Sequence, residues 1–322
     1  MKRKAFLIIL LAVVICCLSA CSSAQSVDSG NAQAGASSSQ QSAQGEAAEN
    51  QQDANNFARN NYFGAKKFDA SVYNVGKEDK YIGMRFFERP IFSVGSADDP
   101  GFERILQPGV VGPHHKMPRD WVENAKTVIS FFLPFSDRVL ESNIPDRNMV
   151  SMEWMFTRVD GQNHLLATAA AVVDALRAQG YQAVAPQIDD RYILKATAAQ
   201  ATEDFPAFSS NWSERHVAYV TGLGTFGLNT NFISKAGCAG RLISVVTDWE
   251  CPIDEKDYDG YLDYCNKCGA CIKKCPAQAI ENGCIKDHLK CGSFIHEMCA
   301  PYTPRYGCGK CQSGIPCQRK HM

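Results

Sequence analysis

The 322-residue chain lacks an excess of either charge, a membrane-spanning hydrophobic run and, over most of its length, cysteine. Its formal net charge is -1 at pH 7, which excludes broad electrostatic capture of nucleic acid, so nucleic acid is not an expected partner. The apolar stretch at residues 5–18 is shorter than the ~20 residues that a spanning helix needs. No cysteine lies between residues 22 and 237, which excludes a disulfide scaffold extending through the whole chain.

Residues 1–21 are predicted to be a bacterial lipoprotein signal peptide. Three basic residues precede the apolar stretch, which ends in Leu-Ser-Ala-Cys at residues 18–21. Small residues before a cysteine are typical of a lipobox, so we expect Cys21 to carry a lipid anchor. That anchor would hold the protein at the extracytoplasmic face of a bacterial membrane. An ordinary secretory signal and a short uncleaved anchor are the alternatives.

Residues 22–57 contain no Lys or Arg and consist mainly of Ser, Gln, Ala, Asn and Gly. Such a segment cannot bury enough apolar surface to offset the entropy lost on ordering. We predict a disordered tether that holds the folded part roughly 30–35 Å from the membrane.

Residues 58–255 are predicted to form an α/β or α+β domain. A nearly continuous apolar run at 128–133 is typical of a strand buried on both faces. Apolar residues at helical spacing predict a helix over 164–179, and further short strands are expected at 181–184 and 242–247. Strands alternating with helices favour a layered domain.

Three glycines, Gly222, Gly224 and Gly227, match the G-x-G-x-x-G pattern of dinucleotide-binding loops. A dinucleotide site would need a strand before them and a helix beginning among them. The preceding residues, 213–219, instead favour a helix, and residues 228–232 are not a convincing helix start. We therefore expect a glycine-rich turn that ends a helix and lets the backbone approach packed side chains or a flat cofactor.

Twelve of the 15 cysteines crowd into residues 238–322. Four of them form the run Cys265-x2-Cys268-x2-Cys271-x3-Cys275-Pro276, which has the spacing of a bacterial ferredoxin. In such a run three thiolates hold one [4Fe–4S] cluster, and the fourth is a ligand of a second cluster. Residues 256–322 are therefore predicted to form a small ferredoxin-like domain with two [4Fe–4S] clusters.

A second cysteine group supplies the reciprocal ligands: Cys308, Cys311 and Cys317. Two clusters need eight ligands, so on spacing alone the eighth is Cys284, Cys291 or Cys299. A disulfide module and a zinc site are the alternatives for an exported chain. Disulfide frameworks seldom place three cysteines at successive three-residue intervals, and structural zinc sites usually use separated C-x-x-C pairs.

Three stretches together resemble epoxyqueuosine reductase and, more distantly, the cobalamin-dependent reductive dehalogenases. They are Ser213-Glu214-Arg215-His216, the glycine-rich residues 222–230, and the ferredoxin run. The likeness is strong over about residues 205–322 and weak from about residue 80 onward. It implies an α/β domain that holds base-off cobalamin, fused to a ferredoxin module that delivers electrons to cobalt.

The resemblance also implies cofactor contacts. The glycine-rich segment would lie near the corrin ring, which assigns cobalamin contacts to Gly222, Gly224, Gly227, Asn229 and Thr230. The chain has no D-x-H-x-x-G stretch, as expected for a cobalamin without a protein histidine ligand.

By position in the family pattern, the eighth ligand is Cys291. One ligand set would then be Cys265, Cys268, Cys271 and Cys317, and the other Cys275, Cys291, Cys308 and Cys311. The last gap departs from the pattern, since five residues separate Cys311 from Cys317 where the family has three. Cys284 and Cys299 therefore stay as alternatives to Cys317.

No catalytic residue is assigned. The family reductase has an aspartate shortly before the Glu-Arg pair as proton donor, and the matching residues 208–212 contain none. Glu203 and Asp204 lie further upstream. Tyr219 is a candidate by chemistry alone, since tyrosine on a helix more often packs, and the pair at 114–115 is given no role.

These features predict a membrane-tethered oxidoreductase that passes electrons through two [4Fe–4S] clusters to cobalamin, which reduces a small molecule. A redox partner protein or a low-potential donor would supply the electrons. The alternative is a non-catalytic electron carrier whose α/β domain binds a redox partner. The missing aspartate favours the carrier, whereas the glycine-rich segment favours the enzyme. A disulfide-bonded binding lipoprotein is a third interpretation.

Overall fold

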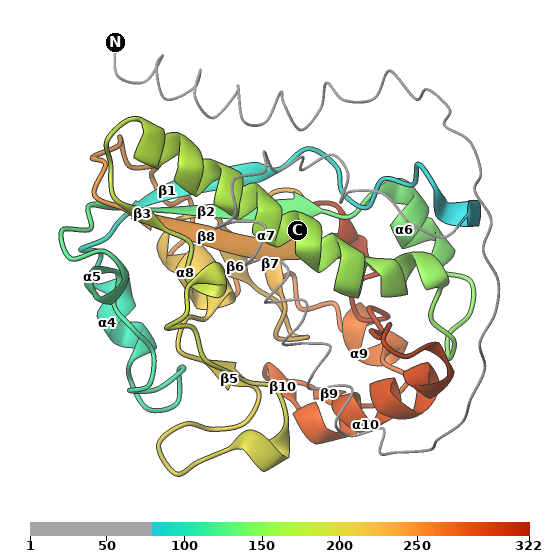
Figure 1. Cartoon of the computed structure of the whole chain (residues 1–322). Coiled ribbons are helices and arrows are strands. Elements are labelled where there is room, and N and C mark those ends of the chain that lie inside the picture. The colour runs from blue at the N-terminus through green and yellow to red at the C-terminus, as the bar shows by residue number, and fades with distance from the viewer. Residues whose placement is uncertain (1–78) are drawn as a thin grey trace, which may run out of the picture.

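The computed structural model describes residues 79–322. Its centre is a four-stranded sheet with the order β1-β2-β8-β3, in which every neighbouring pair is antiparallel (Figure 1). The strands are β1 (Ile91–Ser96), β2 (Thr127–Pro134), β3 (Ala183–Val184) and β8 (Gly240–Thr247). The predicted signal peptide, tether and first part of the α/β domain lie outside the described residues.

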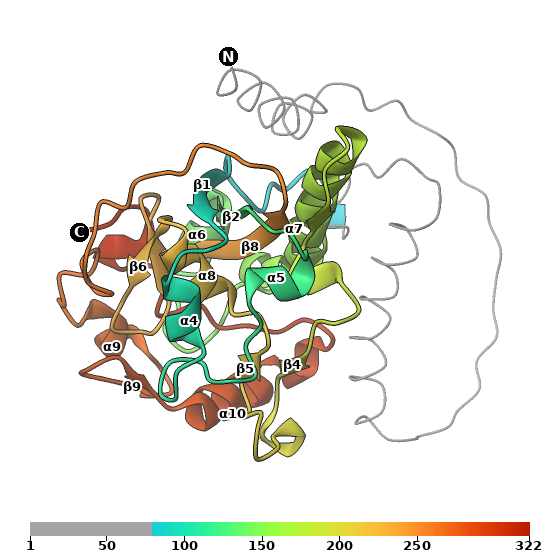
Figure 2. The same cartoon turned by 90° about the vertical axis from the view of Figure 1, so that its left-hand side faces the viewer.

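Helices cover both faces of this sheet. The 27-residue helix α7 (Met152–Ala178) lies across one face, and α8 (Glu214–Val220) packs on the other (Figures 1 and 2). The short helices α4 (Gly101–Ile105) and α5 (Pro118–Trp121) lie on the α8 side. Within residues 79–322, no helix has the length and apolar character that crossing a membrane requires.

Strand β2 is buried along its whole length, as predicted. Because successive side chains of a strand point to opposite faces, its residues contribute to two cores. Ile129 and Phe131 belong to the core that includes α7. Val128 packs instead with Trp212 and Val217 beside α8. The continuous apolar run thus reflects a central antiparallel strand between two helical layers.

The predicted helix at 164–179 is correct in type, but its start was wrong. Helix α7 begins at Met152, where Ser151 accepts a backbone hydrogen bond from the first turn. Its first half is buried with polar residues on the buried surface, among them Thr157 and Asp160. These residues interrupt the apolar periodicity, so the sequence pattern marks only the second half.

The strand predicted at 242–247 forms as β8. The strand predicted at 181–184 is shorter than expected and forms as β3, because Tyr181 and Gln182 are exposed and do not pair with β8. The remaining elements before residue 250 are α6 (Asp137–Ser142), β4 (Leu194–Lys195), β5 (Ser209–Ser210), β6 (Gly224–Phe226) and β7 (Phe232–Ser234). Short 3-10 turns are Asp79–Tyr81, Pro186–Ile188, Ala198–Gln200, Ala300–Tyr302 and Pro316–Gln318.

The C-terminal segment forms a small module beside the α8 face of the sheet (Figure 1). It contains α9 (Ala270–Lys274), β9 (Ile280–Glu281), β10 (Ile285–Lys286) and α10 (His288–Cys299). The fold class is therefore confirmed as a mixed α/β domain followed by a small cysteine-rich module.

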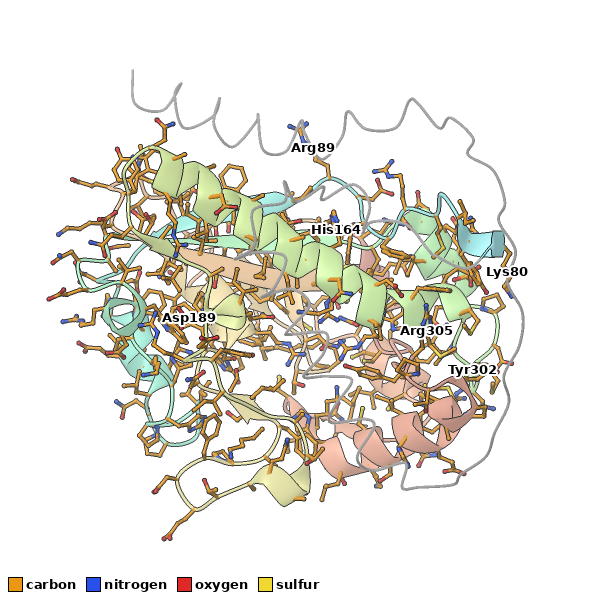
Figure 3. The ribbon with its side chains drawn as sticks, in the orientation of Figure 1. Lys80, Arg89, His164, Asp189, Tyr302 and Arg305 are labelled. Atoms are coloured by element: carbon orange, nitrogen blue, oxygen red, sulfur yellow. The ribbon has the colours of Figure 1, made fainter. Side chains whose placement is uncertain are left out.

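Several contacts fix this module to the α/β domain, and two of them show where it docks. Arg305, on the loop after α10, lies near α7 and pairs with Asp160 of that helix at 3.3 Å (Figure 3). The backbone N–H of Cys238, which leads into β8, donates to the carbonyl oxygen of Cys317 at 2.8 Å. The last part of the module is thus attached both to α7 and to the segment that leads into β8.

Candidate iron–sulfur site

A cavity between the C-terminal module and the β6–β7 segment brings together the four cysteines expected to hold one cluster. Its walls include Cys265, Cys268, Cys271 and Cys317. The other lining residues are mostly small or apolar and include Gly227, Leu228, Ile233, Gly269 and Ile315. Soft thiols around an apolar cavity are the donor set that a [4Fe–4S] cluster uses.

Local backbone geometry places the first three of these cysteines. Lys267 and Gly269 both adopt left-handed conformations, with φ of 59° and 72°. The chain therefore coils tightly between Cys265 and Cys271, and α9 begins directly after the second turn. The backbone N–H of Cys268 is held by the side chain of Asn266 at 3.2 Å.

The second expected ligand set also gathers in one place. Cys275, Cys291 and Cys311 pack in a single apolar cluster. Cys308 lies within electrostatic range of Cys291 and Cys311. The backbone N–H of Ala279 donates to the Cys275 sulfur at 3.3 Å. Such N–H donors to sulfur are one of the factors that set the reduction potential of a cluster.

The two sets lie next to each other. Burial raises the pKa of Cys271 to about 12, and the nearby Cys311, Cys317 and Cys265 add to this effect. Burial likewise raises the pKa of Cys308 to about 12. Because ligands must be thiolates, metal charge has to displace these protons, so cluster loading and deprotonation are coupled.

Cys317 lines the cavity, whereas its two alternatives do not. Cys284 is half-buried and within electrostatic range of Cys265. Cys299 is buried in the core beside Met155. The structure therefore places Cys317 in the cavity with the ferredoxin run, while Cys284 packs in the same apolar cluster and Cys299 lies apart in the core.

The described residues contain no disulfide: all twelve cysteines of residues 79–322 are free thiols. In the same part of the chain, no three His, Cys, Asp or Glu side chains converge closely enough to hold a single metal ion.

The glycine-rich segment is a turn, as favoured, and not a dinucleotide loop. Helix α8 precedes it and strand β6 begins within it. Gly222 has a φ of 90°, and a Cβ on Gly224 would lie 2.1 Å from the carbonyl oxygen of Ile233. A Cβ on Gly227 would lie 3.0 Å from Asn229 and Ile233 atoms. Packing therefore favours glycine at Gly224 and Gly227, and the positive φ favours it at Gly222.

Asn229 forms a hydrogen bond to the second cysteine set, and nothing in the sequence pattern indicates this contact. Its side-chain N–H donates to the carbonyl oxygen of Cys311 at 2.7 Å, and its Oδ1 accepts from the backbone N–H of Asn231. Asn231 in turn donates to the Cys311 sulfur at 3.5 Å. Thr230 adopts a left-handed φ of 58° between them. These residues, expected beside cobalamin, lie against the cysteines.

The residues considered for proton donation are placed as follows. Asn211 and Trp212, where the family aspartate would fall, are buried, and the Trp212 indole donates to Ser244 at 2.8 Å. Glu203 and Asp204 are exposed. The Tyr219 ring packs on Tyr258, as expected for a helical tyrosine.

His115, which was given no role, holds the start of α8. Its Nε2 accepts a hydrogen bond from the backbone N–H of Ser213 at 2.9 Å. Burial lowers the pKa of His115 to about 3, with a smaller effect of His216. Burial raises the pKa of Glu214, the residue after Ser213, to about 7.

Comparison with known proteins agrees with this geometry. The 4Fe-4S binding domain family matches residues 261–281, which contain the ferredoxin run. Epoxyqueuosine reductase of Francisella cf. novicida is 33% identical over 113 residues, covering 32% of this chain and 31% of that protein. The Aliivibrio fischeri enzyme is 33% identical over 119 residues, covering 33% and 31%. The chain thus matches about a third of the length of these relatives.

Solved structures resemble the chain only distantly. A catabolic reductive dehalogenase in complex with 3-bromo-4-hydroxybenzoic acid has a TM-score of 0.48 and 16% identity, covering 72% of this chain and 30% of that one. Epoxyqueuosine reductase from Streptococcus thermophilus has a TM-score of 0.42 and 17% identity, covering 77% and 64%. Likeness at this level carries no information about activity.

The fold and the site define a mixed α/β protein with an iron–sulfur domain near its C-terminus. More particularly, about a third of the chain is distantly similar in sequence to epoxyqueuosine reductases.

Proposed function

We propose that the chain is an oxidoreductase that carries electrons through two [4Fe–4S] clusters, held by the two cysteine sets. The observation that carries this proposal is the meeting of Cys317 with Cys265, Cys268 and Cys271 around one cavity. Bound [4Fe–4S] clusters supply one-electron transfer at low potential. The electrostatic contact between Cys271 and Cys311 supports transfer between two neighbouring centres.

Residues of the chain hold and shield these centres. Leu228, Ile233 and Ile315 form apolar walls of the first cavity, which limits water beside the sulfurs. Asn231 and the backbone of Ala279 donate hydrogen bonds to sulfurs of the second set. Hydrogen-bond donors to sulfur raise the reduction potential, because they stabilise the more negative reduced form, whereas low solvent access lowers it.

The finer proposal is a reductase in which base-off cobalamin is the immediate electron acceptor and a small molecule is the substrate. Its support is the resemblance to epoxyqueuosine reductases at residues 213–216 and 222–230, together with the partial match to those enzymes. The rival is a carrier without cobalamin, which the packed glycines and the missing aspartate favour. Either protein would need a redox partner or a low-potential donor.

Location is also a proposal. The lipobox supports attachment through Cys21 to the extracytoplasmic face of a bacterial membrane, and this residue lies outside the described part of the chain. A modified tRNA is cytoplasmic, so an outward-facing protein of net charge -1 is better suited to a small-molecule substrate.

One experiment tests the function and separates the rivals. The protein is reconstituted anaerobically with iron, sulfide and hydroxocobalamin, and its iron, sulfide and cobalt contents and visible spectrum are measured. About eight irons per chain support the iron–sulfur function. Stoichiometric cobalt identifies the reductase, and iron without cobalt identifies the carrier. Protein that takes up neither iron nor cobalt contradicts both.

A further inference from the structure

Basic side chains from separate elements converge beside the second cysteine set. Arg158 of α7 donates to the Tyr306 hydroxyl at 3.4 Å, and its guanidinium lies 4.9 Å from the centre of that ring. Arg241, near the start of β8, donates to Gln162. Gln162 is one helical turn from Arg158 on α7, so both arginines meet the same face of that helix.

A third arginine, Arg215 of α8, completes the group. A hydrogen-bonded chain reaches it from Gln162, which donates to Gln187 at 3.1 Å. Gln187 donates to Glu214 at 3.1 Å, and Arg215 is the next residue. Arg215 lies within electrostatic range of the other two arginines and of the Cys311 thiol.

No carboxylate among the described residues pairs with these arginines. Arg158, Arg215 and Arg241 form no salt bridge with any residue between 79 and 322, and Arg215 donates no hydrogen bond there. The Nε of Arg241 is buried and has no partner among those residues. Burial, and then the neighbouring Arg158, lower the pKa of Arg241 to about 9, which shows how poorly the cation is accommodated. Glu214 carries only part of its negative charge at neutral pH, because burial raises its pKa to about 7.

The group is open to solvent. Arg215 is exposed, Tyr306 is 37% exposed, and Arg158 and Arg241 are half-buried. Arg215 and Tyr306 are thus the members of the group that a ligand from solution meets first, with Arg158 and Arg241 behind them. Lys286 of β10 adds a further positive charge on the Cys311 side.

We infer that Arg158, Arg215 and Arg241, with Tyr306, bind an oxyanion group, a carboxylate or a phosphate, carried by a small molecule. Guanidinium groups match such oxyanions with paired N–H donors, and uncompensated neighbouring cations favour an anion between them. The position next to Cys311 places the bound anion beside the second cluster set. We take the bound small molecule to be the electron acceptor, and this step rests on the proposed function. The substrate would then be an organic anion.

The rival explanation is that the arginines only balance the negative charge of the clusters. This explanation predicts that the protein does not bind an added anion once its clusters are in place. The binding test is therefore made on cluster-loaded protein of measured iron content and without cobalamin.

Inorganic phosphate and acetate are titrated into wild type, Arg215→Gln, Arg241→Gln and the control Arg119→Gln by isothermal calorimetry. Arg119 is an exposed arginine 3.9 Å from Asp98 and is not part of the group. We expect saturable binding of at least one anion to wild type and the control, weakened tenfold or more in the other two. Arg215 is exposed, so Arg215→Gln remains decisive if Arg241→Gln does not fold.

Two results overturn the inference: loaded wild type that binds neither anion, or equal binding by all four proteins. If wild type binds neither anion and Arg215→Gln lowers the reduction potential of a cluster, the arginines have the charge-balancing role instead. The iron content of the same samples tests the proposed function separately, so its failure is distinguishable from failure of the anion site.

Discussion

The sulfur of Cys238 lies 3.8 Å from the sulfur of Cys317, although 79 residues separate them. In the structure the Cys317 thiol donates to the Cys238 sulfur. The same hydrogen bond lowers the pKa of Cys317 and raises that of Cys238, so Cys238 becomes the donor once Cys317 is a thiolate. Cys238 is thus a buried donor to an expected cluster ligand and does not line the cavity itself.

We therefore expect Cys238→Ala to retain about eight irons per chain but to lower the reduction potential of one cluster, because the donor that stabilises the reduced form is lost. Cys238→Ser keeps a donor and should shift the potential less. Iron analysis and potentiometric titration measure both effects. A loss of about four irons in Cys238→Ala would instead identify Cys238 as a ligand.

The ligand assignment predicts different outcomes for two neighbouring cysteines. Cys317→Ser should lose one cluster, leaving about four irons per chain. Cys284→Ser is the matched control, because Cys284 is also half-buried and packs in the same apolar cluster. It should retain the wild-type iron content. The reverse result would make Cys284, in place of Cys317, the fourth ligand of the first set.

The glycine-rich turn is expected to depend on packing. Gly224→Ala places a Cβ 2.1 Å from the carbonyl oxygen of Ile233, so it should lower the free energy of unfolding by about 3 kcal/mol. Gly283 also has positive φ, but no atom lies within 4 Å of its Cβ position, so Gly283→Ala should cost about 1 kcal/mol. Denaturant unfolding compares them. Unchanged stability in Gly224→Ala, with reduced cobalamin binding, would show that the glycine serves the cofactor.

Protonation of His115 should make stability depend on pH. Its native pKa is about 3, below the unfolded value of 6.5, so acidification favours the unfolded chain. Between pH 7.5 and 5.5 this costs about 1 kcal/mol. The raised pKa of Glu214 acts in the opposite direction, so the His115 contribution is the difference between wild type and His115→Gln.

His115→Gln keeps an acceptor for the backbone N–H of Ser213 and does not titrate. The measurement is the free energy of unfolding at both pH values. Equal changes in wild type and variant would mean that His115 is not buried as the structure shows.

The sequence allows prediction where the signal is local. The continuous apolar run of β2 and the cysteine spacing from 265 to 275 each lie within a few residues, so both the central strand and the iron–sulfur domain are predictable. The start of α7 is not, because buried polar residues such as Asp160 remove the apolar periodicity.

Contacts between distant residues are invisible in the pattern. The approach of Cys238 to Cys317 depends on how the C-terminal module docks beside β8. The convergence of Arg158, Arg215 and Arg241 depends in the same way on the packing of two helices and a strand. Each of these residues, taken alone in the sequence, resembles an ordinary surface or core position.

The most direct test of the central claim is the iron and acid-labile sulfide content of the reconstituted chain, with its Mössbauer spectrum. We predict about eight irons and eight sulfides per chain, in two [4Fe–4S] clusters with thiolate ligands. A chain that stays colourless after reconstitution, with its cysteines oxidised to disulfides or bound to zinc, would contradict the account.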